Sequence, residues 1–134
     1  MAQITLLTAA TATSSAPTLV TDGAALPFAT DLATLFLFST AGSATMTTTC
    51  RLWGWNTELA KWFPLGVGAA ATKGTINAGA AMDETGTDSI RHCEVVNSLH
   101  RIQRVYLQVT VISGTNTAVS AVLDCLPATK TGSN

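Results

Sequence analysis

Hydrophobic and polar residues alternate through residues 104–126, and this stretch has the clearest pattern in the chain. In residues 104–111, valine and leucine take every second position, with arginine, tyrosine, glutamine and threonine between them. A period of two places the apolar side chains on one face of a β-strand. Residues 117–126 alternate again, and the intervening Ser-Gly-Thr-Asn of residues 113–116 is typical of a turn. We therefore predict a β-hairpin at the centre of an antiparallel sheet.

Other stretches also have the patterns of strands. Residues 32–39 are apolar at most positions, which predicts a strand that is covered on both faces. Residues 44–55 carry a run of threonines, whose branched β-carbons favour an extended chain. Residues 61–65 follow after a short turn and predict a hairpin with that strand. Residues 88–96 alternate and predict one more strand before the central hairpin.

The whole pattern has about eight short strands separated by turn signals, with no convincing helix. It predicts an all-β fold, an antiparallel β-sandwich of about eight strands. The long connections favour jelly-roll or Greek-key wiring, and the sequence leaves both open. We expect residues 26–127 to form the sandwich and residues 128–134 to form a polar, flexible C-terminal tail.

Residues 1–25 are rich in threonine, alanine and serine. Short strands are predicted at residues 4–7 and 18–21, so we expect an extended N-terminal arm that lies on a neighbouring subunit; a floppy terminus is the alternative. The candidate interface residues of this arm are Ile4, Leu6, Leu7, Pro17 and Leu19. The segment lacks the basic start of an export signal, so we interpret it as mature protein.

Charged residues make up only 11% of the chain, against roughly 25% in an ordinary soluble domain. This composition favours a protein whose surface is covered in a larger assembly. A small β-protein kept in solution by threonine hydroxyls is the alternative. The net charge is −1 and the lysines and arginines are scattered, which argues against a nucleic acid partner. The longest apolar run, residues 35–38, is far too short to span a membrane.

The chain has three cysteines, Cys50, Cys93 and Cys125, without the spacing of a metal site. All three lie in predicted strands, where we expect them to be small buried apolar residues in a protein made in a reducing cytoplasm. One disulfide with one thiol left over is the alternative.

No catalytic or metal-binding residue is indicated, and we expect neither an enzyme nor a cofactor. His92 and Cys93 are adjacent, so on a strand they point to opposite faces and do not share a metal. Residues 83–88 are acidic, but their spacing does not match an EF-hand calcium loop. No glycine-rich phosphate loop follows a predicted strand.

Trp53, Trp55 and Trp62 are the candidate binding residues. Trp53 and Trp55 share a strand face and lie about 7 Å apart, close to the spacing of successive sugar rings. They are candidates for stacking on a glycan. The alternative, which we favour, places the tryptophans in the core or in an interface between subunits.

Four stretches resemble the small all-β virion proteins of tailed bacteriophages. They are RLWGW at residues 51–55, KWFPLG at 61–66, DETG at 83–86, and residues 104–123, together about a quarter of the chain. The resemblance implies a jelly-roll-like structural protein on the phage particle, most plausibly a capsid decoration or cement protein that binds and stabilises the head.

The same resemblance implies the partners and the location. The partners are the major capsid protein and two further copies of the chain in a homotrimer. The location is the capsid surface of the virion, after synthesis of the chain in the host cytoplasm. The alternative is a carbohydrate-binding module or a host-surface adhesin of the phage tail, with a glycan as its partner.

Overall fold

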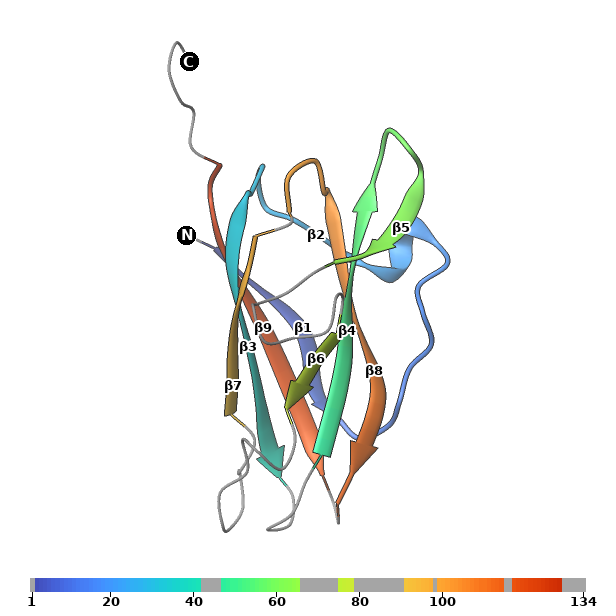
Figure 1. Ribbon diagram of the computed structural model, residues 1–134, viewed down its shortest axis with the longest axis vertical. Helices are drawn as coiled ribbons and strands as arrows, with labels where there is room; N and C mark the ends of the chain where they lie inside the picture. The colour runs from blue at the N-terminus through green and yellow to red at the C-terminus, as the bar shows by residue number, and fades with distance from the viewer. Residues whose placement is uncertain are drawn as a thin grey trace.

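The computed structural model describes residues 2–41, 47–65, 75–78, 91–97, 99–114 and 117–128. Two antiparallel sheets lie face to face, so the predicted all-β sandwich is confirmed (Figure 1). One sheet has the order β1-β9-β3-β7, and the other has the order β2-β8-β4-β5 with β6 also paired to β4. The strands are β1 (Ala2–Ala10), β2 (Ala24–Ala25), β3 (Leu32–Ala41), β4 (Thr47–Asn56), β5 (Lys61–Pro64), β6 (Thr75–Ala78), β7 (Arg91–Val96), β8 (Arg104–Ser113) and β9 (Ala118–Leu126).

The core lies between the two sheets and is filled by the apolar side chains at every second position of the strands. Leu35 of β3 is paired with Leu123 of β9, and both side chains are fully buried. In the other sheet, Leu52 of β4 is paired with Leu107 of β8, and these are buried as well. The inward positions of the strands are therefore the apolar positions that the alternation indicates.

The predicted hairpin of residues 104–126 is wrong, because its two strands belong to different sheets. β8 pairs with β2 and β4, whereas β9 pairs with β1 and β3. The chain therefore passes from one sheet to the other between β8 and β9, and on either side of this link the Thr117 hydroxyl donates a hydrogen bond to the Ser113 carbonyl oxygen at 3.0 Å. An alternating strand buries one face whether its sequence neighbour lies beside it or across the core. The pattern alone does not distinguish the two arrangements.

Strand β3 has one covered face, not the two that its sequence predicts. Leu35 and Leu37 point into the core and are fully buried, but Phe36 and Phe38 keep 39% and 36% of their surface exposed. The hairpin predicted from residues 44–65 is confirmed, since β4 pairs with β5 and Trp55 lies opposite Trp62.

Most of the predicted N-terminal arm belongs to the sandwich of its own chain. Strand β1 pairs with β9 from Ala2 opposite Cys125 to Ala10 opposite Val119. The Ile4, Leu6 and Leu7 side chains pack against the core. These apolar residues complete a sheet whose central strands are distant in sequence, and that role is not visible in the local composition.

The strand predicted at residues 18–21 is also wrong, because a 3-10 helix, η1, forms at Val20–Asp22. The Asp22 carboxylate accepts hydrogen bonds from the backbone N–H groups of Thr18 at 2.9 Å and Leu19 at 2.8 Å. These bonds, that of Thr18 first, hold the pKa of Asp22 below its ordinary value. Local hydrogen bonding by aspartate competes with an extended chain. Pro17 is buried beside this turn, and Leu19 is exposed.

The connection from β1 to η1 runs along the outside of β8 (Figure 1). The Ser14 backbone N–H donates to the Val109 carbonyl oxygen at 2.9 Å, and the Val109 N–H donates to Ser14 Oγ at 3.0 Å. The acidic turn predicted at residues 83–88 and the tail from residue 129 onward lie outside the described residues.

Gly23 is required where this connection passes between a tryptophan ring and a strand. A Cβ at this position would collide with the Trp62 ring and lie 2.8 Å from the Val105 carbonyl oxygen. We expect Gly23→Ala to lower the free energy of unfolding by roughly 1–3 kcal/mol in urea denaturation. In a Trp62→Ala background the same substitution is expected to cost less, and an unchanged cost would contradict the role of the ring.

Candidate functional site

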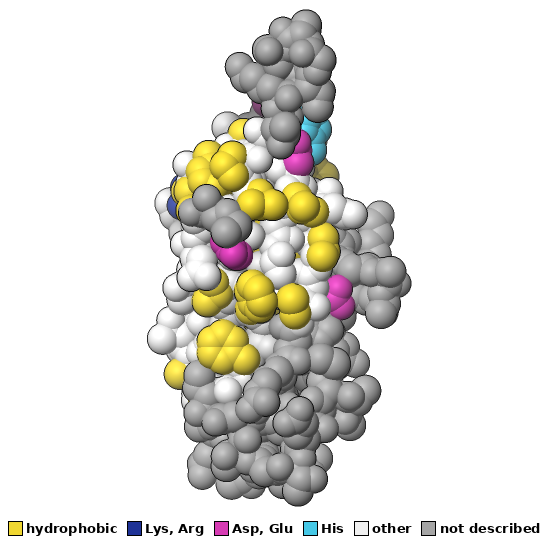
Figure 2. Space-filling model, turned by 90° about the vertical axis from the view of Figure 1, so that its left-hand side faces the viewer, with side chains coloured by type: hydrophobic (Ala, Val, Ile, Leu, Met, Phe, Trp, Pro, Cys, Tyr) yellow, Lys and Arg dark blue, Asp and Glu magenta, His cyan; other side chains and the backbone are white. Residues whose placement is uncertain are grey.

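The outer face of the four-stranded sheet is apolar. Phe36 of β3 lies between Val122 of β9 and Cys93 of β7, and Leu32 lies beside Leu126. We call the following residues of this surface the outer apolar face: Leu32, Phe36, Phe38, Val95, Val122 and Leu126. Figure 2 views the molecule from this side and shows hydrophobic side chains grouped on it.

The outer apolar face has the size of the largest apolar patch of a typical monomer. Leu32 is 42% exposed, Val95 51% and Leu126 39%, in addition to the two phenylalanines. Together these five side chains expose on the order of 400 Å² of apolar area, which is the size at which a patch on a monomer is often functional. Asp124 brings a carboxylate into the face, between Val122 and Leu126 along β9 and in register with Gln3 and Thr34.

Cys93 is exposed on this side of the sheet, so the prediction that all three cysteines are buried is wrong for this residue. Cys50 and Cys125 are buried as predicted, and all three thiols are free. Burial raises the pKa of the Cys50 thiol to about 12. Burial, and then the nearby Asp124 charge, raise the pKa of Cys125.

These environments predict selective thiol chemistry, since the reactive species is the thiolate. At pH 8 we expect a maleimide reagent to label Cys93 in the folded protein, while Cys50 and Cys125 react only after unfolding. Peptide mass spectrometry of the labelled protein checks this, with Cys93→Ser as the control. Rapid labelling of Cys50 or Cys125 under native conditions would contradict the burial described above.

The outer face of the five-stranded sheet carries aromatic side chains instead. The Trp55 and Trp62 ring centroids are 5.5 Å apart at an interplanar angle of 63°, and those of Trp62 and Tyr106 are 6.4 Å apart. We call Trp53, Trp55, Trp62 and Tyr106 the aromatic face. Of the two places predicted for the tryptophans, the core is excluded, because none of them belongs to the buried cluster between the sheets; the interface between subunits stays a prediction.

Much of the aromatic face is held by hydrogen bonds within the chain. Trp62 Nε1 donates to the Leu19 carbonyl oxygen at 3.0 Å, and the Tyr106 hydroxyl donates to the Ser15 carbonyl oxygen at 3.1 Å. These bonds fasten the connection between β1 and η1 to the sheet. Trp62 and Tyr106 therefore have a structural role that the sequence did not indicate.

Trp53 and Trp55 remain half-buried on the aromatic face. Trp53 Nε1 donates to Gln108 Oε1 at 3.0 Å, and the Arg51 guanidinium lies 6.0 Å from the centroid of the Trp53 ring. A cation over an indole ring fixes both groups with little loss of exposed area. The surface thus combines flat apolar rings with polar hydrogen-bonding groups, which suits recognition of a protein or a sugar.

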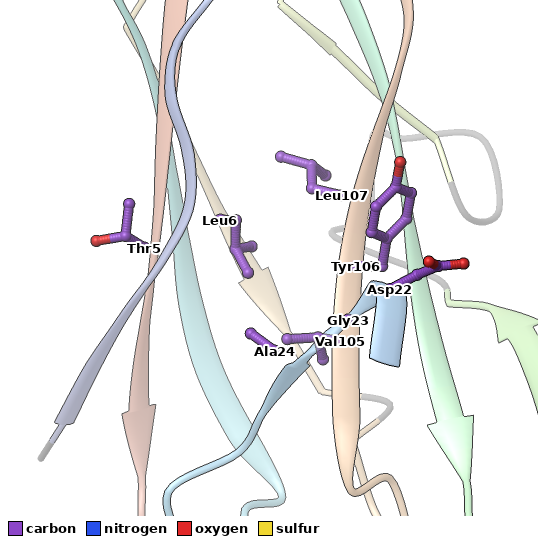
Figure 3. A pocket seen from close by; sticks show the side chains of 8 residues that line it. All are labelled: Thr5, Leu6, Asp22, Gly23, Ala24, Val105, Tyr106 and Leu107. Carbon is purple, nitrogen blue, oxygen red and sulfur yellow. The ribbon is translucent and has the colours of Figure 1, made fainter. Parts of the chain in front are cut away.

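A cavity of about 290 Å³ lies between β1 and β8 (Figure 3). Leu6 and Ala24 lie in the space between the two strands, whereas the Thr5 and Tyr106 side chains are directed away from it. The complete lining is Thr5, Leu6, Asp22, Gly23, Ala24, Val105, Tyr106 and Leu107. The one carboxylate in this lining, that of Asp22, is already bonded to backbone N–H groups. The cavity therefore offers a small space with a mixed polar and apolar lining and no acid–base pair.

The ionisable groups at the surface form simple pairs. His100 Nδ1 lies 3.2 Å from Asp31 Oδ1, and Arg101 Nη1 lies 3.2 Å from Glu58 Oε1, and all four side chains are exposed. Such exposed pairs contribute little to stability. Within the described part of the chain, no group of three His, Cys, Asp or Glu side chains is placed to hold a metal ion, and no helix has the length and apolarity to cross a bilayer. Comparisons with protein-family models, with curated proteins and with solved structures find no match.

Proposed function

We propose that this chain is a structural virion protein of a tailed bacteriophage, a decoration or cement protein that binds the capsid and stabilises the head. The observation that carries the proposal is the aromatic face, where Trp53, Trp55 and Arg51 lie together on a protein with few charges. Tryptophan, tyrosine and arginine are the residues that most often dominate the binding energy of protein interfaces. The phage head is proposed as the partner because residues 51–55, 61–66, 83–86 and 104–123 resemble phage virion proteins.

In this proposal the aromatic face lies on the major capsid protein. Trp55 and Trp53 supply the buried apolar area, at about 25 cal/mol per Å² before the entropy cost of association. Arg51 and Gln108 supply polar groups at the side of the rings. A copy that contacts two adjacent capsid subunits holds them together, because separating the subunits then also breaks the contacts with that copy.

The test is binding to heads of the phage that encodes the chain. We expect the chain in purified particles by mass spectrometry, and we expect added protein to raise the melting temperature of undecorated heads. Trp55→Ala is expected to weaken head binding at least tenfold with little effect on folding, because the ring is only half-buried. The matched control is Leu59→Ala, which changes a residue that is 60% exposed in the turn after β4. Absence of the chain from particles, or equal binding by Trp55→Ala, would reject the proposal.

Carbohydrate binding, as a tail adhesin, is the second candidate. It is favoured by the position of Trp53 and Trp55 on one outward face beside Gln108 and Arg51. The angle of 63° between Trp55 and Trp62 weighs against it, since these two rings do not form a flat platform for successive sugars. Binding of the protein to a glycan array, lost in Trp55→Ala and kept in Leu59→Ala, would replace the capsid by a glycan as the partner.

A further inference from the structure

We propose that the outer apolar face binds the same face of a second copy of this chain. Two four-stranded sheets then stack at the centre of a dimer, and the two aromatic faces point away from each other. This inference concerns copies of the chain only. It does not depend on the phage capsid or a glycan as the other partner.

The chemistry of the face fits a sheet of the same kind. Its middle row is Val122, Phe36 and Cys93, with Phe38 and Leu32 further along β3 on the same side. Flat sheets with such side chains pack at about 10 Å from one another, as the two sheets of one copy do. Phenylalanine rings at partial exposure gain both apolar burial and ring–ring contacts when a second sheet covers them.

The size of the face also fits one copy. Four strands spaced about 4.8 Å apart, with residues rising about 3.3 Å, give a surface of roughly 19 Å by 20–33 Å. Stacking two such surfaces covers about 400–600 Å² on each copy, a total of roughly 800–1,200 Å², which is the lower end of specific interfaces and fits a reversible dimer. A face that binds the same face of another copy forms a dimer with a two-fold axis. Neither copy of that dimer then has this face free for a third chain. The face therefore favours a dimer over the trimer that the sequence resemblance implies.

The charge of the outer apolar face favours a second copy of the chain over a membrane surface as its partner. Peripheral membrane binding combines an apolar face with lysines and arginines that attract anionic lipids. Here Asp124 lies in register with Thr34, Arg91 is the residue paired with Phe38, and the whole chain has a net charge of −1, so the described residues of the face include no cluster of lysines and arginines. A second copy needs no such attraction, because the apolar rows dominate the contact.

The first test is the mass of the full chain in solution by analytical ultracentrifugation over a range of concentrations. We expect a monomer–dimer equilibrium for the wild type. The double variant Phe36→Ser with Phe38→Ser is expected to raise the dissociation constant at least 100-fold, and Leu59→Ser to leave it unchanged. Both phenylalanines are partly exposed in the single chain, so the dilute double variant should keep the circular dichroism spectrum of the wild type and unfold cooperatively, at a lower melting temperature.

The second test uses Cys93, whose backbone is paired with Phe36. We expect maleimide labelling of Cys93 to slow at least tenfold between dilute and dimer-forming concentrations, and we expect no slowing in the double variant. A monomer at every concentration, a trimer, or a dimer that survives the double substitution would overturn the inference. Loss of head binding in the double variant of a protein that is monomeric alone would also overturn it, because the face would then belong to the capsid.

Discussion

Deletion of residues 2–10 is expected to abolish cooperative folding. The deletion removes the whole of β1, its backbone hydrogen bonds to β9, and the packing of Ile4, Leu6 and Leu7 on the core. Each partly buried aliphatic side chain contributes about 1–2 kcal/mol and each hydrogen bond about 1 kcal/mol. The sum is on the order of the 5–15 kcal/mol that stabilises a whole domain. Far-ultraviolet circular dichroism and urea denaturation measure the effect.

Point substitutions separate the two faces of β1. The double variant Leu6→Ser with Leu7→Ser is expected to lower the free energy of unfolding by several kcal/mol, because these side chains pack against the core. The control is the double variant Thr5→Ala with Thr8→Ala. Both threonines are exposed on the same strand, so this variant should change the free energy of unfolding by less than about 0.5 kcal/mol. A protein that lacks residues 2–10 and still unfolds like the wild type would show that the segment is a dispensable arm.

Leu35→Ala is expected to lower the free energy of unfolding by about 2–5 kcal/mol, whereas Phe36→Ala lowers it much less in dilute protein. Leu35 is fully buried and paired with Leu123, so its truncation leaves a cavity between the sheets. Phe36 is the next residue, but it points outward and is 39% exposed. Urea denaturation of both variants at low concentration compares the two faces of one strand.

The same comparison at high concentration links stability to self-association. If two copies cover the outer apolar face, the wild-type midpoint rises with protein concentration, because association favours the folded state. Phe36→Ala should lose most of this rise, and Leu35→Ala should keep it. Equal costs of the two substitutions at low concentration would instead mean that β3 is covered on both faces within one chain, as its sequence predicts.

The residues of the candidate surfaces were only partly predictable. The sequence singled out Trp53, Trp55 and Trp62 as a group, and the structure places Trp55 and Trp62 in contact outside the core. Tyr106 was recognised only as the polar member of an alternating strand. Its contact with Trp62 depends on β8 and β5 lying on either side of β4. A search for aromatic residues at the polar positions of strands would have found it.

The apolar pattern of residues 32–39 indicated the outer apolar face, but it was interpreted as a strand that is covered on both faces. Phenylalanines alternate with leucines in residues 32–39, and this predicts an apolar strand without saying which face is covered. Coverage depends on whether another layer lies on that side, and the described layers stop at the four-stranded sheet. Cys93 follows the same rule, since its exposure is set by its pairing with the outward Phe36.

An antiparallel β-sandwich could be predicted from the residue pattern, because the period of two and the β-branched residues act within each strand. The apolar side of most strands could be predicted in the same way. Three features depend on contacts between distant segments: β8 and β9 belong to opposite sheets, residues 2–10 complete a sheet, and the tryptophans lie outside the core. Burial and backbone pairing join segments far apart in the chain, and a local pattern is the same for every partner that satisfies it.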